Sequence, residues 1–96
     1  MNEQNKQQET FTQLQHAEQI TITILQQLSS DEVTPLRALY TFALAFLAVV
    51  QQTDRPVYEP AQLEHVCAFI LWQYPLSEQF PFTKADMLYA LNSNGS

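Results

Sequence analysis

The feature that most constrains the fold is an almost unbroken apolar run from Ala38 to Val50. Apart from Thr41 and the hydroxyl group of Tyr40, every side chain in this run is apolar. A helix without a polar face must be surrounded by protein or lipid. The run has 13 residues, whereas a helix that crosses a bilayer needs roughly 20. The sequence therefore predicts a central helix that is buried by other segments of protein.

Composition favours an all-α fold. The chain has 96 residues, 46% of them hydrophobic, and its single glycine is at position 95. This length supports one domain at most. Scarce glycine, abundant Ala, Leu and Gln, and the lack of hairpin dipeptides between strand-like runs all argue against β-structure. We predict a small bundle of three main helices plus a short C-terminal fourth helix.

Proline and capping residues set the expected limits of two helices. Thr34 followed by Pro35 is a typical helix start, because threonine can cap the first turn and proline fits the first helical position. This start predicts that the buried central helix spans roughly 35–52. Glu59–Pro60 opens a third helix in the same way, and Pro75 ends it.

The first and last helices are predicted from apolar spacing and from a capping box. Apolar side chains recur on one face of a helix over 10–28, namely Phe11, Leu14, Ala17, Ile24, Leu25 and Leu28. The segment 20–24 also alternates as a strand would, but an isolated strand would have no partner. After a proline-bounded loop over 75–82, Thr83 and Asp86 have the spacing of a capping box and open the fourth helix.

The two ends of the chain are polar. Residues 1–9 are rich in Gln, Asn and Glu, a composition typical of disordered segments, and 92–96 look similar. We therefore expect a disordered N-terminal tail, a single helical domain over 10–91 and a short polar C-terminal tail.

Charge and cysteine content restrict the partners and the compartment. The formal net charge is −6, and the four basic residues are scattered, so direct binding to a nucleic acid is not expected. The chain has one cysteine and hence no intrachain disulfide, and its polar N-terminus is no signal peptide. Both observations favour the reducing cytoplasm. The short apolar run and the polar remainder of the chain predict that it does not associate with membranes.

The expected central helix has small residues along one face. They are Ala38, Thr41, Ala45 and Ala48. Small side chains let a second helix approach closely. That helix could belong to the same chain or to a second copy in a dimer.

The third helix has two apolar stripes. The first is an ordinary core stripe of Leu63, Val66, Cys67, Ile70 and Tyr74. The second lies on the opposite face and consists of His65, Ala68, Phe69 and Trp72. Either the fourth helix and the loop over 75–82 cover this second stripe, or it is an exposed aromatic patch that binds a partner. Tryptophan and other aromatic residues are typical of interface hot spots, so these four residues are the candidate protein interface.

The sequence offers little for catalysis. His65 and Cys67 are two positions apart, which places them on nearly opposite sides of a helix, so they cannot form a thiolate–imidazole pair. No spacing of His, Cys and carboxylates fits a metal site. No paired carboxylates lie in an apolar run, as an acid with a raised pKa would require. We therefore predict neither an enzyme nor a bound cofactor or metal.

These observations predict a non-catalytic protein–protein interaction module: a small cytoplasmic adaptor, chaperone-like factor or regulator. Its partner would be another protein or a second copy in a homodimer. The alternative is a small acidic inhibitor, of the kind that mobile elements carry, which blocks a nucleic-acid-handling enzyme. A clustered acidic face would favour the inhibitor, whereas a hydrophobic patch with scattered acids would favour the interaction module.

Overall fold

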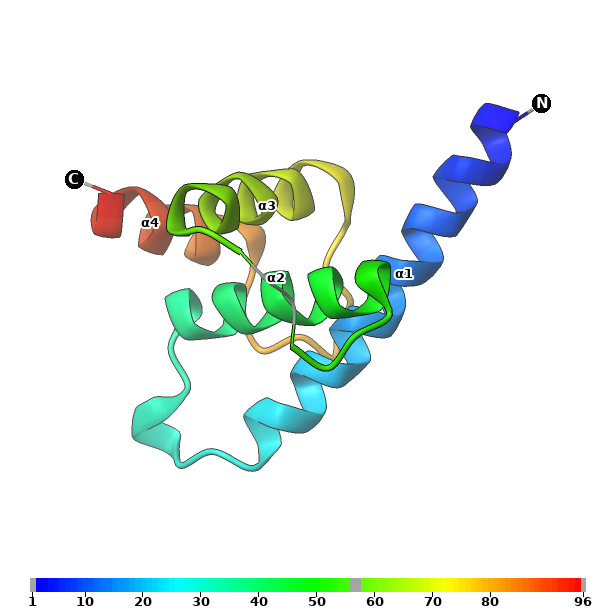
Figure 1. The fold of residues 1–96 in the computed structure, drawn as a ribbon. Helices are drawn as coiled ribbons and strands as arrows, with labels where there is room; N and C mark the ends of the chain where they lie inside the picture. Colours follow the sequence, from blue (N-terminus) through cyan, green and yellow to red (C-terminus); the bar gives the residue numbers. More distant parts are fainter. Residues whose placement is uncertain (1, 56–57, 96) are drawn as a thin grey trace.

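The computed structural model describes residues 2–55 and 58–95, and all regular structure within these ranges is helical. The elements are α1 (Asn2–Gln26), a short 3-10 helix η1 (Ser30–Glu32), α2 (Pro35–Gln51), α3 (Pro60–Gln73) and α4 (Lys84–Gly95). Figure 1 shows α2 in the middle, with α1 crossing it on one side and α3 and α4 on the other. The predicted all-α bundle of three main helices and a short fourth is confirmed.

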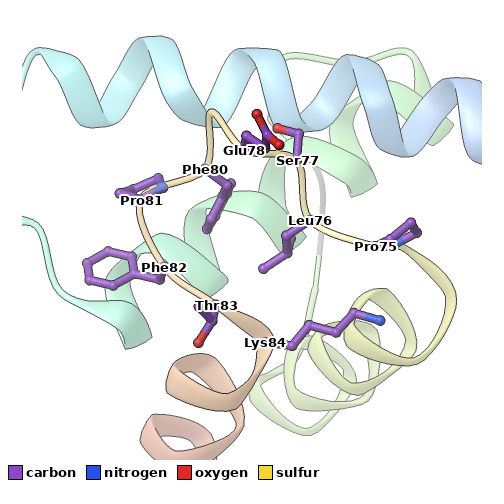
Figure 2. A pocket seen from close by; sticks show the side chains of 9 residues that line it. All are labelled: Pro75, Leu76, Ser77, Glu78, Phe80, Pro81, Phe82, Thr83 and Lys84. Atoms are coloured by element: carbon purple, nitrogen blue, oxygen red, sulfur yellow. The ribbon is translucent and has the colours of Figure 1, made fainter.

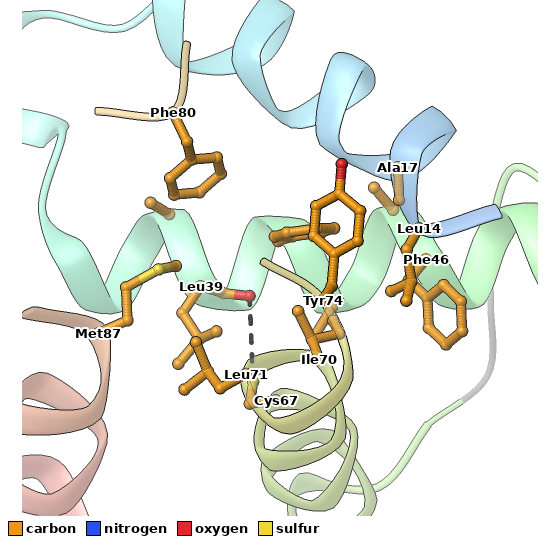
Figure 3. Packing of buried hydrophobic residues seen from close by; sticks show 14 of the residues in the cluster. Leu14, Ala17, Leu39, Phe46, Cys67, Ile70, Leu71, Tyr74, Phe80 and Met87 are labelled. Carbon is orange, nitrogen blue, oxygen red and sulfur yellow. Dashed lines mark hydrogen bonds between the residues drawn. The ribbon is translucent and has the colours of Figure 1, made fainter. Parts of the chain in front are cut away.

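The predicted burial of the central helix follows from its contacts with all three other helices. Leu39, Phe42 and Ala43 have no exposed surface at all. The ring of Phe42 meets Tyr74 edge-on at 5.9 Å and Phe80 at 5.7 Å between ring centroids. Side chains from all four helices and from the segment 75–82 join this core, part of which is drawn in Figure 3.

Local capping explains where the helices begin and end. The Thr34 Oγ1 atom accepts a hydrogen bond of 3.1 Å from the Arg37 N–H, as expected for the cap of α2. At the other end, Gln52 adopts the left-handed conformation, with φ 54°, and Thr53 N–H donates to the Ala48 carbonyl at 3.1 Å. This pattern closes α2 one residue before the predicted end. Pro56, which is also unfavourable for continuing a helix, lies outside the described residues.

The predicted capping box of α4 is also present. The Thr83 N–H donates to the Asp86 carboxylate at 3.1 Å, and the Asp86 N–H donates to Thr83 Oγ1 at 3.2 Å. Aspartate therefore replaces the more usual glutamate of this motif.

The first and last helices extend into the two polar ends of the chain. We expected disorder over 1–9, but α1 begins at Asn2 and therefore includes most of that segment. Gln, Glu and Lys are good helix formers, and extending an existing helix requires no new nucleation. Likewise, α4 continues to Gly95, past the predicted end of the helical domain at 91. Met1 and Ser96 lie outside the described residues.

Three of the four small residues of α2, namely Thr41, Ala45 and Ala48, face α1. Ala45 is buried and Thr41 and Ala48 are half-buried. Together with Ile20 and Ile24 of α1 they line a shallow cavity between the two helices. These residues therefore face a helix of the same chain, which is the first of the two alternatives stated.

We expect Phe42→Ala to lower the free energy of unfolding by about 3–5 kcal/mol, because it removes a fully buried ring and leaves a cavity at the centre of the core. Leu44→Ala, on the half-buried side of the same helix, should have a clearly smaller effect. Chemical denaturation of both variants measures the difference. An equal loss of unfolding free energy in the two variants would contradict the central position of Phe42 in the core.

Candidate protein-interaction surface

The two predicted stripes of α3 lie in different environments. The core stripe is buried at Leu63, Cys67, Ile70 and Tyr74, and Val66 is half-buried. The second stripe, His65, Ala68, Phe69 and Trp72, is exposed along its whole length. We refer to these four residues as the α3 outer face. The sequence reasoning missed Leu71, which is also buried.

The fourth helix and the segment 75–82 leave the α3 outer face uncovered. Trp72 is 83% exposed and Phe69 is 38% exposed. Figure 3 shows Met87 of α4 on the side of Leu39 and Leu71, within the core. Of the two alternatives for this stripe, the structure therefore has the open aromatic patch.

One member of the α3 outer face is also part of an internal ring contact. The ring of Phe69 stacks on that of Phe46 of α2, with centroids 6.0 Å apart and an interplanar angle of 23°. This contact restricts the rotamer of Phe69 while one side of its ring stays accessible. The patch is therefore partly pre-organised, which lowers the entropy lost on binding.

A groove adjoins the α3 outer face. It has a volume of about 530 Å³ and lies between the N-terminal half of α1 and the C-terminal half of α3. Its lining consists of Lys6, Gln7, Thr10, Phe11, Leu14, Phe69 and Gln73. Phe11, which we expected on the core face of the first helix, is 45% exposed, and its ring lies 5.3 Å from that of Tyr74. The groove joins residues about sixty positions apart, so local sequence patterns did not predict it.

A buried carboxylate fixes the end of α3 and the segment that follows it. Glu18 of α1 is only 1% exposed. Its Oε1 atom accepts a hydrogen bond of 3.0 Å from the Tyr74 hydroxyl group, and its Oε2 atom accepts one of 3.0 Å from the Ser77 N–H. Figure 3 shows the Tyr74 hydroxyl group directed at α1. Glu18 was not among the predicted residues, although it lies beside Leu14 and Ala17 on the buried side of α1.

The segment 75–82 borders a second cavity, of about 570 Å³, with Thr83 and Lys84 at its lower edge in Figure 2. Most of its lining is apolar, and Phe80 extends from it into the core. The start of α4 could attract an anion, but the Asp86 carboxylate already occupies that position in the capping box. The chemistry of this cavity therefore does not favour an anionic ligand.

The potential nucleophiles of the chain are poorly placed for reaction. Burial raises the pKa of the Cys67 thiol to about 12, and the nearby Glu64 charge acts in the same direction. The thiol is fully buried, at 4.0 Å from the Leu39 carbonyl oxygen, whereas His65 is exposed on the other side of α3. Burial and the hydrogen bond to Glu18 raise the pKa of Tyr74 to about 12. Both groups are therefore protonated at neutral pH.

Models of known protein families, curated proteins and solved structures contain no match to this chain. Among the described residues, none of the helices combines the length and apolarity needed to cross a bilayer. The same residues include no group of three or more His, Cys, Asp or Glu side chains that could hold a metal ion. A function therefore has to be inferred from the surface of the molecule itself.

The raised pKa values predict loss of stability at alkaline pH. The pKa of Tyr74 rises from 10.0 to about 12 on folding, and that of Cys67 rises from 9.0 to about 12. The folded state thus binds these protons more tightly, and the resulting stability is complete below pH 9 and declines as the pH rises to about 12. Denaturation at a series of pH values measures this slope. The double variant Tyr74→Phe/Cys67→Ala should have a flatter slope, and an unchanged slope would contradict the assignment.

We expect Glu18→Ala to lower the free energy of unfolding by about 2 kcal/mol or more, because two donors lose their acceptor in a buried site. The Ser77 amide should also exchange its hydrogen faster. Gln15→Ala, at an exposed position of the same helix, is the matched control. Unchanged stability and unchanged exchange at Ser77 would show that Glu18 does not hold the segment 75–82.

Proposed function

We propose that this protein is a protein-interaction module that binds its partner through the α3 outer face. The observation that carries the proposal is the 83% exposure of Trp72. An exposed tryptophan leaves a large apolar surface in water, and tryptophan is the residue most typical of interface hot spots. Phe69 extends the patch toward the groove, and Ala68 leaves room for a second helix to approach.

The position of the α3 outer face on a rigid element supports this role. The opposite side of α3 is held in the core by Cys67 and Ile70, and its C-terminal end is held by the Tyr74 hydrogen bond to Glu18. The aromatic patch is therefore presented in a fixed orientation. A small cytoplasmic adaptor, chaperone-like factor or regulator would use such a surface.

A non-catalytic role agrees with the surroundings of the reactive groups. The Cys67 thiol is buried and protonated, and His65 is exposed on the other side of α3. Exposed acids are spread over several elements, at Glu9, Asp31, Glu32, Asp54, Glu59, Glu64, Glu78 and Asp86. A hydrophobic patch with scattered acids favours the interaction module over the acidic inhibitor of a nucleic-acid-handling enzyme.

We expect Trp72→Ala to weaken binding to the partner by about 2 kcal/mol or more, roughly thirtyfold, while thermal stability stays close to that of the native protein. Affinity capture from the source cell, followed by mass spectrometry and titration of the captured partner, measures the effect.

The matched control is Tyr89→Ala on α4, which removes another exposed aromatic ring, 76% exposed. The Tyr89→Ala variant should bind the partner as tightly as the native protein does. Equal retention by the native protein and both variants would contradict binding through the α3 outer face. A fall in thermal stability with unchanged binding would instead identify Trp72 as a structural residue.

A further inference from the structure

We propose that the α3 outer face binds a second copy of this chain, in an antiparallel α3–α3 pair about a two-fold axis. This inference rests on the proposed function and names its partner. Three observations support it: the surface area of the isolated chain, the order of residues along α3, and the projecting end of α1.

The isolated chain exposes more surface than a compact monomer of its mass. Its accessible surface is 6700 Å², whereas the scaling relation for monomers gives about 5,700 Å² for 11.1 kDa. The excess of about 1,000 Å² is close to the roughly 800 Å² that each partner buries in a standard interface. The excess is thus large enough to be covered by a second copy, and the projecting half of α1, which contributes to it, borders the α3 outer face.

The residue order on the α3 outer face is suited to self-pairing. In an antiparallel pair of identical helices, positions that are equally distant from the two-fold axis face each other. An axis between Ala68 and Phe69 places Trp72 of each copy opposite His65 of the other. His65 and Trp72 lie at the two ends of the face, equally far from the axis, so the pair would contain two identical ring contacts. Ala68 lies beside the axis, where its small side chain allows the two helices to approach closely.

The projecting end of α1 would contribute to the same interface. Figure 1 shows the N-terminal half of α1 extending away from the body of the molecule. Lys6, Gln7 and Thr10 line the groove beside the C-terminal end of α3. In an antiparallel pair this end of one α3 adjoins the N-terminal end of the other. The second copy would therefore cover turns of α1 that extend beyond the core of their own chain, and it would stabilise them by packing.

Charge distinguishes a second copy from a basic partner. Each chain has a formal net charge of −6, so bringing two copies together is opposed by repulsion. Salt screens this repulsion, and self-association should strengthen between about 20 mM and 300 mM salt. Binding of a basic partner would weaken over the same range.

The first experiment uses a cysteine as a reporter of the two-fold axis. The native thiol is buried, so a cysteine introduced at an exposed position is the reactive one. Ala68→Cys places two thiols across the axis, where the helices approach within the roughly 4.4–6.8 Å that a disulfide requires between Cα atoms. Under mild oxidation this variant should form a covalent dimer at least about tenfold faster than Ala85→Cys, because pairing raises the effective thiol concentration.

Ala85→Cys is the matched control, since Ala85 is also an exposed alanine on a helix, α4. The proposed pairing would be overturned if both variants formed the covalent dimer at equal rates. It would also be overturned if neither variant formed one.

The second experiment measures mass by sedimentation equilibrium over a range of concentrations. The native protein and Tyr89→Ala should reach the mass of a dimer, and Trp72→Ala should raise the dissociation constant by about tenfold or more. In the same measurement, self-association of the native protein should become stronger as the salt concentration rises. A native protein that stays monomeric, or a Trp72→Ala variant that dimerises as the native protein does, overturns the inference.

The two proposals fail separately. If the native protein is monomeric but Trp72→Ala loses a captured partner, the interaction surface is correct and its occupant is another protein. If the native protein dimerises and Trp72→Ala changes neither dimerisation nor capture, both the α3 pairing and the proposed function of this face are wrong.

Discussion

The structure depends on the need to cover most of the surface of α2. Its apolar residues leave no face that is stable in water, so each of the other helices packs against it. In a chain of 96 residues, few residues remain to cover other apolar surfaces once α2 is covered. α3 therefore contributes one stripe to the core, and no further element covers its other side. The exposed tryptophan is in this sense a result of how the chain buries its central helix.

Local signals in the sequence predicted most of the helices. The Thr34–Pro35 start, the Glu59–Pro60 start and the Thr83–Asp86 capping box act over three or four residues, so they can be recognised without knowledge of the fold. The two stripes of α3 were visible for the same reason, since helical spacing determines which side chains share a face. The structure of the N-terminal segment was harder to predict, because its Gln-rich composition is compatible with both a disordered tail and an extension of α1.

Contacts between distant segments could not be predicted in this way. Glu18 meets Tyr74 and Ser77 across more than fifty residues, and the groove beside Phe69 likewise requires the relative placement of α1 and α3. One signal was nevertheless present. Glu18 follows Leu14 by four positions and precedes Thr21 by three, so it lies on the stripe of α1 that turns toward the core. A carboxylate at such a position indicates a buried polar contact whose partner the sequence alone does not identify.

The Glu18 contact also has a consequence for the order in which the chain folds. α1 and α2 are neighbours in the sequence and can pair as soon as both have been synthesised. Glu18 then lies at the margin of this helical hairpin and remains hydrated, because its two donors belong to residues 74 and 77. Only when that later segment arrives can the carboxylate leave water without a large desolvation penalty. We therefore expect closure of the segment 75–82 over α1 to be a late step of folding, since both donors to Glu18 come from this part of the chain.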